Sequence, residues 1–394
     1  MKKQLLFILL CGIISAFPLF IRCKQGKTYS ESSVPKIYTS FKPGKLWNDT
    51  EGNPIQSHFG SIFYDLGVYY WIGQNYIGGT TIPKGSFQNQ PFTWNFNAGL
   101  SIYSSTDLYN WKLESIVLNE TSYEPGNLLQ PLNLIGRPNI IKCEMTGKYI
   151  LFGVLLSPDF QTINDVIWAV SDSPVGPYEF QGKLQWANSP SLTGDIWKSE
   201  KQTGKRDPPE RIRGWDMKIF KDEDQKAYLI VGHGDTYIYE LSNDYTFVVK
   251  GALMEGAEGE APALLKDNHT YYLFESRLSG YKANCNTYFT SDNVWGPWEP
   301  KGKFASGPDE ETTFKSQVAH VFSLAGRPGK NIFISGKYSE ISGSEVPDFL
   351  EFRHIWLPLE INRENKTVVV RWRDQWTLEE DRKSTRLNSS HVSQ

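Results

Sequence analysis

The sequence predicts an all-β protein, and more specifically a five-bladed β-propeller. One kind of segment recurs five times along the 394 residues, which is typical of a repeat architecture. Each copy carries a turn-forming cluster between two apolar or aromatic runs, the pattern of a β-hairpin. Aromatic residues make up 14% of the chain, beside 33 Gly and 22 Pro, and this composition favours short strands and tight turns over long helices.

The five copies share one order of features. Each has a polar or Gly/Pro-containing start, an apolar run, a turn and then an aromatic-rich run, so each is expected to form a hairpin. The copies begin at His58, Arg137, Asp216, Glu260 and Ser316, and their turns are expected at 65–67, 145–147, 222–224, 267–269 and 326–329.

A second element follows the hairpin in most copies. It reads as a strand, a Ser/Asp turn and an aromatic residue, at 101–111, 167–178, 237–248 and 286–298. Each copy therefore supplies about four strands, the size of a propeller blade. Blades packed around an axis bury both faces of each sheet, whereas the alternative, a two-sheet sandwich, gives no reason for five like units. The polar segment 184–213 is expected to be a surface loop near the axial mouth.

The N-terminus reads as an export signal over residues 1–23. Two lysines precede an apolar stretch at 5–21 that is too short and interrupted for a convincing spanning helix. Cleavage would release a soluble protein into the periplasm or the extracellular space. Cys23 offers the alternative of a lipid-anchored surface protein, although Arg22 ahead of it makes a poor lipidation signal.

A single domain is predicted over residues 24–380. The segments between the repeats are too short to act as a linker between two domains. Residues 381–394 resemble the translation of a sequencing adapter, so we expect them to be non-native and to carry no functional information.

Charge and cysteine usage narrow the classes of function. The formal net charge is −3 with no long run of one sign, so neither nucleic acid nor an anionic membrane is an expected partner. No Cys/His spacing resembles a zinc site and no cofactor is expected, while an axial ion such as calcium is left open. Cys143 and Cys285 could form a disulfide in an oxidising compartment or remain two separate thiols.

The residues that open the repeats should converge on one pocket, because the innermost strand of each blade begins near the axis. In chain order they are His58, Arg137, Asp216, Glu260 and Gln317. Two carboxylates in such a pocket suit glycoside hydrolysis. One group must donate a proton to the leaving oxygen, and another must sustain the charge that makes this donation effective.

Seven segments resemble, in order, the motifs of glycoside hydrolase family 43, and within it the exo-acting β-1,3-galactanase-like branch. The resemblance runs from about residue 45 to 325 and implies a five-bladed propeller that hydrolyses glycosidic bonds. The segments are WNDTEGNPIQSHFG at 47–60, GRPNIIKCEMTGKY at 136–149, SDSPVGPY at 171–178, GWDMKIFKDEDQKAYLI at 214–230, EGEAPALLKDNHTYYL at 258–273, SGYKAN at 279–284 and SQVAHV at 316–321.

The resemblance also implies catalytic roles. Glu260, in an EAP motif, matches the general acid, and Asp216, in a WDM motif, matches the carboxylate that sets the pKa of this acid. Gln317, in an SQ motif, matches the position that replaces a base in this branch, where the amide is thought to act on water in an imidic-acid form. The usual first-blade Asp base is absent, and an inverting reaction with a water between acid and base is implied.

Five residues are candidates for substrate binding: His58, Arg137, Trp215, Glu258 and Tyr281. All but Glu258 have a structural alternative. The histidine could be an axial packing residue, the arginine could hold a catalytic carboxylate through an ion pair, and the two aromatic side chains could belong to the core.

Gly136 departs from the family pattern, which carries Glu before the Arg-Pro of the second blade. The missing carboxylate would remove a charged hydrogen bond to the sugar. The substrate could differ, another acid such as Glu258 or Asp235 could compensate, or catalysis could be lost. We expect an exported exo-glycosidase acting on plant-type β-1,3-galactan. The alternatives are a carbohydrate-binding propeller without turnover and a family 43 arabinofuranosidase or xylosidase.

Overall fold

The computed structural model describes residues 37–82, 92–119, 128–129, 133–157, 162–192, 212, 214–279, 282–337 and 352–379. In these ranges the regular structure is almost entirely β-strand, with one 3-10 helix at Glu310–Thr312. The predicted all-β class is therefore confirmed. The predicted signal at 1–23, with Cys23, and the predicted non-native tail at 381–394 lie outside the described residues.

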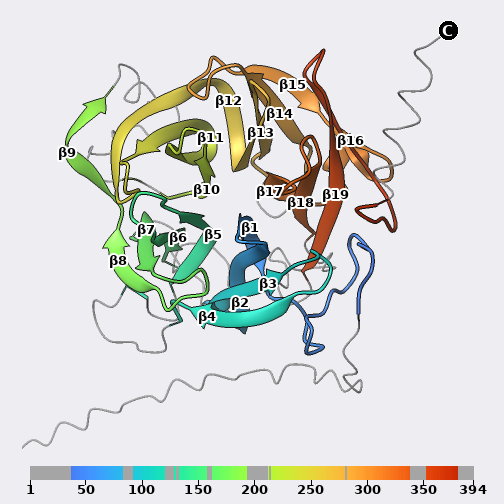
Figure 1. Cartoon of the computed structure of the whole chain (residues 1–394), viewed down its shortest axis with the longest axis horizontal. Coiled ribbons are helices and arrows are strands. Elements are labelled where there is room, and N and C mark those ends of the chain that lie inside the picture. Colours follow the sequence, from blue (N-terminus) through green and yellow to red (C-terminus); the bar gives the residue numbers. More distant parts are fainter. Residues whose placement is uncertain are drawn as a thin grey trace, which may run out of the picture. The chain divides into compact units, whose positions relative to one another are not determined.

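The first two repeats each form a four-stranded antiparallel sheet with its strands in chain order (Figure 1). The first sheet contains β1 (His58–Asp65), β2 (Val68–Ile82), β3 (Phe92–Ser105) and β4 (Lys112–Val117). The second contains β5 (Leu134–Lys142), β6 (Tyr149–Leu156), β7 (Asn164–Ser171) and β8 (Glu179–Lys183).

The third and fourth repeats share one seven-stranded sheet. Its strands are β9 (Gln185–Leu192), β10 (Asp216–Lys221), β11 (Ala227–Leu241), β12 (Phe247–Asp267), β13 (Thr270–Ser276), β14 (Asn286–Ser291) and β15 (Glu299–Lys303). The 21-residue β12 joins the two repeats, because it pairs with β11 up to Glu260 and with β13 from Glu260 onward.

The fifth repeat forms a five-stranded sheet. Its antiparallel strands are β17 (Gln317–Ser323), β18 (Asn331–Lys337), β19 (Arg353–Asn362) and β20 (Thr367–Arg371), and the short β16 (Ala305–Ser306) lies parallel to β20. All five predicted hairpins are therefore present, as β1–β2, β5–β6, β10–β11, β12–β13 and β17–β18.

The first strands of the repeats lie beside one another at the centre of the view in Figure 1. β1 contacts β5, β5 contacts β10, β10 contacts β12, β12 contacts β17, and β17 contacts β1 again. This cycle brings together residues that lie far apart in the sequence. Hydrogen bonding nevertheless gives four sheets rather than five, because β12 serves two repeats.

The predicted loop at 184–213 is wrong for its first part, where residues 185–192 form β9 and pair in parallel with β12. The physical reason is an open sheet edge. β13 pairs with β12 only from Glu260 onward, so the early part of β12 has a free side on which another strand can pair. Polar composition gave no sign of this pairing.

The core consists of buried apolar clusters between the sheets, and the largest of them joins the first sheet to strands of the fourth and fifth repeats. It includes Trp71, Trp111 and Trp356, each no more than 1% exposed. Trp376 and Phe41 close this cluster from the two ends of the described chain. Their backbones form a reciprocal pair of hydrogen bonds of 2.9 and 3.1 Å, and their rings stack at 4.4 Å.

Cys143 and Cys285 are both free thiols, which decides between the two alternatives that the sequence left open. In the described ranges, no helix has the length and apolar character needed to cross a membrane.

Candidate active site

The predicted site residues lie at or near the starts of the first strands, where most of these strands are irregular. Register shifts of the kind made by β-bulges occur in β1, β5, β12 and β17. In three of them the shift contains a residue with a left-handed backbone: Phe59 at φ 50°, Arg137 at φ 49° and Ala261 at φ 55°. Such a bulge breaks the strict alternation of side chains and re-aims those beside it toward the common centre.

Arg137 and Asp216 form a bidentate ion pair between the second and third repeats. The arginine Nε and Nη2 each donate to one carboxylate oxygen at 2.8 Å. Nη2 also donates to Oε1 of Gln317 at 2.7 Å. One guanidinium therefore fixes a carboxylate and an amide that lie 79 and 180 residues away in the sequence.

Gln317 connects this pair to Glu260. Its Nε2 donates to Oε1 of Glu260 at 3.0 Å and to Oγ of Ser276 at 2.9 Å. Because Arg137 can only donate, the amide oxygen must face the arginine and the amide nitrogen must face the acid. The result is a continuous hydrogen-bonded chain from Asp216 through Arg137 and Gln317 to Glu260.

Glu260 has the properties of a proton donor. The residue is only 8% exposed, and burial, followed by the negative charge of Asp216, raises the pKa of its carboxyl to about 7. The Arg137 charge and hydrogen bonds from Gln317 and Ser276 oppose this shift. The carboxyl can therefore hold its proton near neutral pH and still give it up to a bound group, because its neighbours stabilise the anion that remains.

The other substrate-binding candidates lie in different settings. His58 is 1% exposed, its Nε2 lies 2.9 Å from Oε1 of Gln56, and its ring packs against Phe352 at 4.6 Å. Trp215 is half-buried, and His233 stacks on one of its faces at 4.1 Å. His58 is thus enclosed by aromatic side chains, whereas Trp215 keeps part of its surface open.

The acidic candidates outside the hydrogen-bonded chain sit beside it. Glu258 is exposed and pairs across the strands with Asp235, two positions along from the pair formed by Glu260 and His233. Tyr281 lies outside the described residues.

Two residues of the site gave no direct signal in the sequence. Ser276 ends β13 opposite Glu260, and Gln74 lies on β2 opposite His58 and is 3% exposed. Counting pairs back from the hairpin turns could have found both, except that each bulge shifts the count.

Gly136 occupies the same place in its bulge as Glu260 and His58 occupy in theirs, directly before a left-handed residue. A Cβ added there would lie 3.0 Å from Cγ1 of Val154 and 3.7 Å from Nε2 of Gln74. A side chain at position 136 would thus require a small shift of Val154 and would point near Gln74.

Comparisons with known proteins agree with this geometry. The family model described as glycosyl hydrolases family 43 matches residues 53–321. A solved family 43 β-1,3-galactosidase with galactodeoxynojirimycin is 27% identical, with a TM-score of 0.71 over 86% of this chain and 100% of that one. The exo-β-1,3-galactanase of Clostridium thermocellum is 23% identical, with a TM-score of 0.65 over 85% of this chain and 66% of that one, and shows the shared fold.

A xylan 1,3-β-xylosidase of Vibrio sp is 23% identical over 309 residues, which are 72% of this chain. The chain spans about half, 51%, of the length of that relative. The family match covers more than half of the chain, and the converging Asp216, Glu260 and Gln317 lie inside the matched range. The chain therefore belongs to glycoside hydrolase family 43.

Proposed function

We propose that this protein is an exported glycoside hydrolase that removes galactose from the ends of plant-type β-1,3-galactan chains. The single observation that carries the proposal is a buried Glu260 with a pKa of about 7, joined by hydrogen bonds to Asp216 through Arg137 and Gln317. Export rests on the signal-like residues 1–23, and galactan on the relatives named for β-1,3-galactosidase and exo-β-1,3-galactanase activity.

In the proposed reaction Glu260 gives its proton to the glycosidic oxygen while the bond from that oxygen to the anomeric carbon breaks. The electron pair of the bond leaves with the oxygen, and the positive charge that develops on the sugar is stabilised by the negative charge of Asp216. Water adds to the anomeric carbon and releases a proton to solvent, after which Glu260 takes a proton from solvent. The Arg137 charge and a hydrogen bond from Ser276 stabilise the Glu260 anion between these steps.

An inverting reaction requires more distance between Gln317 and Glu260 than the free protein has. Inverting glycosidases hold their acid and base about 6.5–9.5 Å apart to leave room for water. Here Nε2 of Gln317 lies 3.0 Å from Oε1 of Glu260, and the amide already bonds to Arg137 and Ser276. We propose that the sugar opens this contact on binding, and that Gln317 positions the acid in the free enzyme.

We also propose that the five repeats are five propeller blades. The hairpins of all five repeats are present, and their first strands contact one another in a cycle. In this interpretation the third and fourth blades share β12, which bends the hydrogen-bonded sheet from one blade into the next at Glu260. The general acid would then lie at the junction of two blades.

Two other functions have specific support. A carbohydrate-binding propeller without turnover is favoured by Gly136, which leaves no carboxylate at its place in the site, and by the occupied amide of Gln317. A xylosidase is favoured by the Vibrio relative. An arabinofuranosidase remains the other family 43 alternative.

The decisive experiment compares Glu260→Gln with the wild type on β-1,3-galactobiose and on aryl β-galactosides of decreasing leaving-group pKa. Removing a general acid should lower kcat/KM on the disaccharide about 10²–10⁴-fold and much less on the most acidic phenol, which leaves without protonation. Glu255→Gln, an exposed carboxylate on the same strand, is the matched control and should keep full activity.

Each alternative predicts a different outcome. An equal loss on every leaving group would reject Glu260 as the acid. Binding of galactan oligosaccharides without any product from the wild type would favour the binding protein. Release of xylose or arabinose in place of galactose from matched substrates would assign the enzyme to the corresponding activity.

A further inference from the structure

A second pocket lies at the opposite end of the first strands from the catalytic carboxylates. It is lined by residues that follow the strand starts by several positions, among them Ser61 on β1, Asn139 on β5, Leu264 on β12 and His320 on β17. Across the bulges these residues lie two or three pairing steps beyond the site residues of the same strands, which at about 3.3 Å per residue is roughly 7–10 Å. The cavity has a volume of about 290 Å³.

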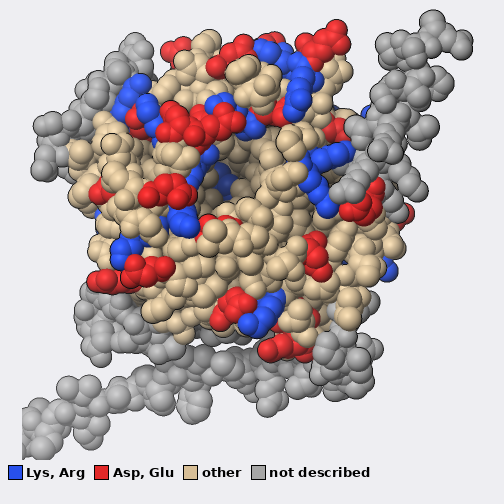
Figure 2. All heavy atoms as spheres, viewed as in Figure 1, with Lys and Arg blue, Asp and Glu red and all other residues tan. Residues whose placement is uncertain are grey.

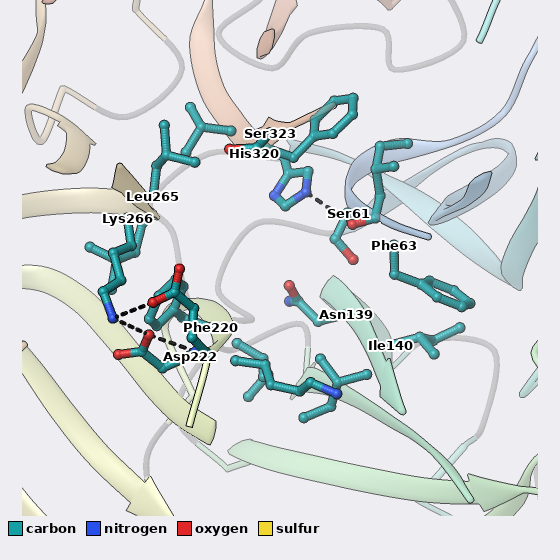
Figure 3. A pocket seen from close by; sticks show the side chains of 18 residues that line it. Ser61, Phe63, Asn139, Ile140, Phe220, Asp222, Leu265, Lys266, His320 and Ser323 are labelled. Atoms are coloured by element: carbon teal, nitrogen blue, oxygen red, sulfur yellow. Dashed lines mark hydrogen bonds and ion pairs between the residues drawn. The ribbon is translucent and has the colours of Figure 1, made fainter. Parts of the chain in front are cut away.

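The space-filling view supports an opening in this region. Figure 2 shows a hollow near the middle of the drawn face, where the first strands meet in Figure 1, with basic atoms inside it and both acidic and basic side chains around its rim. Figure 3 shows the pocket itself, with side chains from five different strands around an open middle.

His320 presents an unsatisfied acceptor to this pocket. Its Nε2 lies 3.1 Å from the Ile62 carbonyl oxygen, which can only accept, so Nε2 carries the ring proton. Burial, and then the nearby Lys218 amine, hold the pKa of the ring well below its usual range, so the ring is neutral and Nδ1 has a free lone pair. This nitrogen is buried and has no hydrogen-bond partner among the described residues, and Figure 3 shows it facing the open middle.

Two further acceptors face the same space. Nδ2 of Asn139 donates to the Arg137 carbonyl oxygen at 2.8 Å, which fixes the amide so that its oxygen points into the pocket in Figure 3. Ser61 uses its proton on the Pro138 carbonyl oxygen at 3.3 Å, leaving its lone pairs as acceptors. The pocket therefore offers three acceptors from β1, β5 and β17.

The charged side chains at the mouth neutralise one another. Lys266 lies 2.7 Å from Oδ1 of Asp222 and 3.2 Å from Oε2 of Glu223, and the Tyr271 hydroxyl donates to the other oxygen of Asp222 at 2.5 Å. In the described part of the chain, no three His, Cys, Asp or Glu side chains gather as a metal site would require. A ligand that suits this lining is neutral and rich in hydrogen-bond donors.

We infer that the pocket is a second carbohydrate site, which holds one neutral sugar residue. Sugar hydroxyl groups would donate to Nδ1 of His320, Oδ1 of Asn139 and Oγ of Ser61, while the apolar face of the ring packs against Phe220 or Phe322, which also line the cavity. The volume lies near the lower end of the usual range for ligand pockets, which is the size expected for a single sugar ring. This inference does not depend on the proposed hydrolysis.

The test uses the full-length protein with isoleucine methyl groups labelled for NMR. Ile62, Ile140 and Ile219 line the pocket and report binding there, whereas Ile230 is buried elsewhere and serves as an internal reference. Galactose, xylose and arabinose are titrated in turn. At least one of them is expected to shift the three pocket methyl groups in a saturable manner without moving the reference.

Ser61→Val removes one acceptor and fills part of the cavity, so it should weaken this binding at least about tenfold. Ser104→Val, the same change on β3 outside the pocket, is the matched control and should bind as the wild type does. His320→Gln keeps a donor for the Ile62 carbonyl and removes the ring acceptor, so it should also weaken binding even if Ser61→Val folds poorly.

Saturable shifts that are equal in Ser61→Val, His320→Gln and the control would place the sugar elsewhere. Titrations in which the pocket methyl groups stay unmoved by all three sugars would overturn the inference outright. Because these probes report the second pocket alone, either result is independent of whether the site around Glu260 hydrolyses galactan.

Discussion

Glu260 and Asp216 divide their roles by environment. Both are carboxylates at first strands, yet Asp216 is paired bidentately with Arg137, whereas Glu260 is buried beside a neutral amide. Burial, and then the Asp216 charge, raises the pKa of Glu260 to about 7, which favours its protonated form as general acid. The different roles of the two carboxylates therefore follow from the side chains that contact each of them, and not from their residue types.

This assignment predicts the pH dependence of activity. Catalysis needs Glu260 protonated, so kcat/KM should fall as the pH rises through about 7. Asp216→Asn removes the neighbouring negative charge that raises this pKa, and it leaves Arg137 without its partner carboxylate. The alkaline limb of the profile should therefore move down by roughly one pH unit, beside a loss in rate.

The measurement is a pH profile of kcat/KM for both proteins on the same disaccharide. A rate that drops while the alkaline limb stays in place would show that Asp216 does not tune the acid. The exposed Glu255→Gln variant should leave both rate and limb unchanged.

The residues that open the repeats show how far the place of a single side chain can be predicted from the sequence. Arg137, Asp216, Glu260 and Gln317 could be predicted to converge because they open successive repeats, and they do meet. His58 follows the same rule but is enclosed by Phe352, a residue 294 positions away in another repeat. Only the three-dimensional packing reveals this enclosure.

At the scale of strands, a third acid, Glu275, is buried near the backbone positions that pair with Asp216 and precede Glu260. Glu275 on β13 is fully buried, and its Oε1 accepts from Oγ1 of Thr236 at 2.6 Å. A Cβ on Gly259 would lie 2.7 Å from the Cβ of Glu275, and one on Gly232 would lie 3.0 Å from Oε1. Gly232 pairs with Asp216, and Gly259 precedes Glu260. The two glycines therefore provide room for this carboxyl.

Burial raises the pKa of Glu275 to about 8, above its ordinary value of 4.5, despite the hydrogen bond from Thr236. The folded state thus keeps a proton that the unfolded state loses, so the free energy of unfolding should fall as the pH rises from about 4.5 to 8 and then level off. Glu275→Gln has no proton to lose. Its stability relative to the wild type should therefore increase across this window, by at most about 1.4 kcal/mol per pH unit.

Urea unfolding of both proteins at several pH values between 5 and 9 measures this difference. Glu255→Gln should show no pH-dependent difference, because that side chain is exposed. A Glu275→Gln variant whose relative stability does not change with pH would mean that the wild-type carboxyl is already ionised in the fold.

The strands themselves were more predictable than their assembly into sheets. Alternating apolar residues around turn clusters predicted the five hairpins, because local sequence sets hairpin geometry. The sharing of β12 between two repeats and the pairing of β9 could not be predicted, since both depend on which sheet edges remain open after folding. The bulge at Glu260 likewise gave no sign in the sequence, because the register of a strand pair is seen only in the fold.

At the scale of the whole described chain, segments from its two ends complete one core. Phe41 and Trp376 bond to each other through their backbones, and their rings stack. The Trp376 indole also donates to the Trp356 carbonyl oxygen at 2.8 Å, which ties this pair to the fifth-repeat sheet. The same cluster contains Trp71 of the first sheet, so the two ends of the described chain join the first and last repeats.

This arrangement predicts that Trp376→Ala weakens the whole fold. The side chain is 2% exposed, so its removal leaves a large cavity and an unpaired carbonyl group, at a cost of roughly 3–5 kcal/mol in the free energy of unfolding. Trp372→Ala is the matched control, because that indole is only partly buried and packs against Phe314 outside the pairing with Phe41. Thermal and urea unfolding should show a much larger loss for position 376.

The decisive readout is where protection is lost. If Trp376 joins the first and last repeats, hydrogen exchange in Trp376→Ala should rise in β1 and in β19 together, because both strands belong to the cluster that the indole completes. Faster exchange confined to the residues beside position 376 would instead show a locally packed end that contributes nothing to joining the repeats. Equal losses of stability in the two tryptophan variants would lead to the same conclusion.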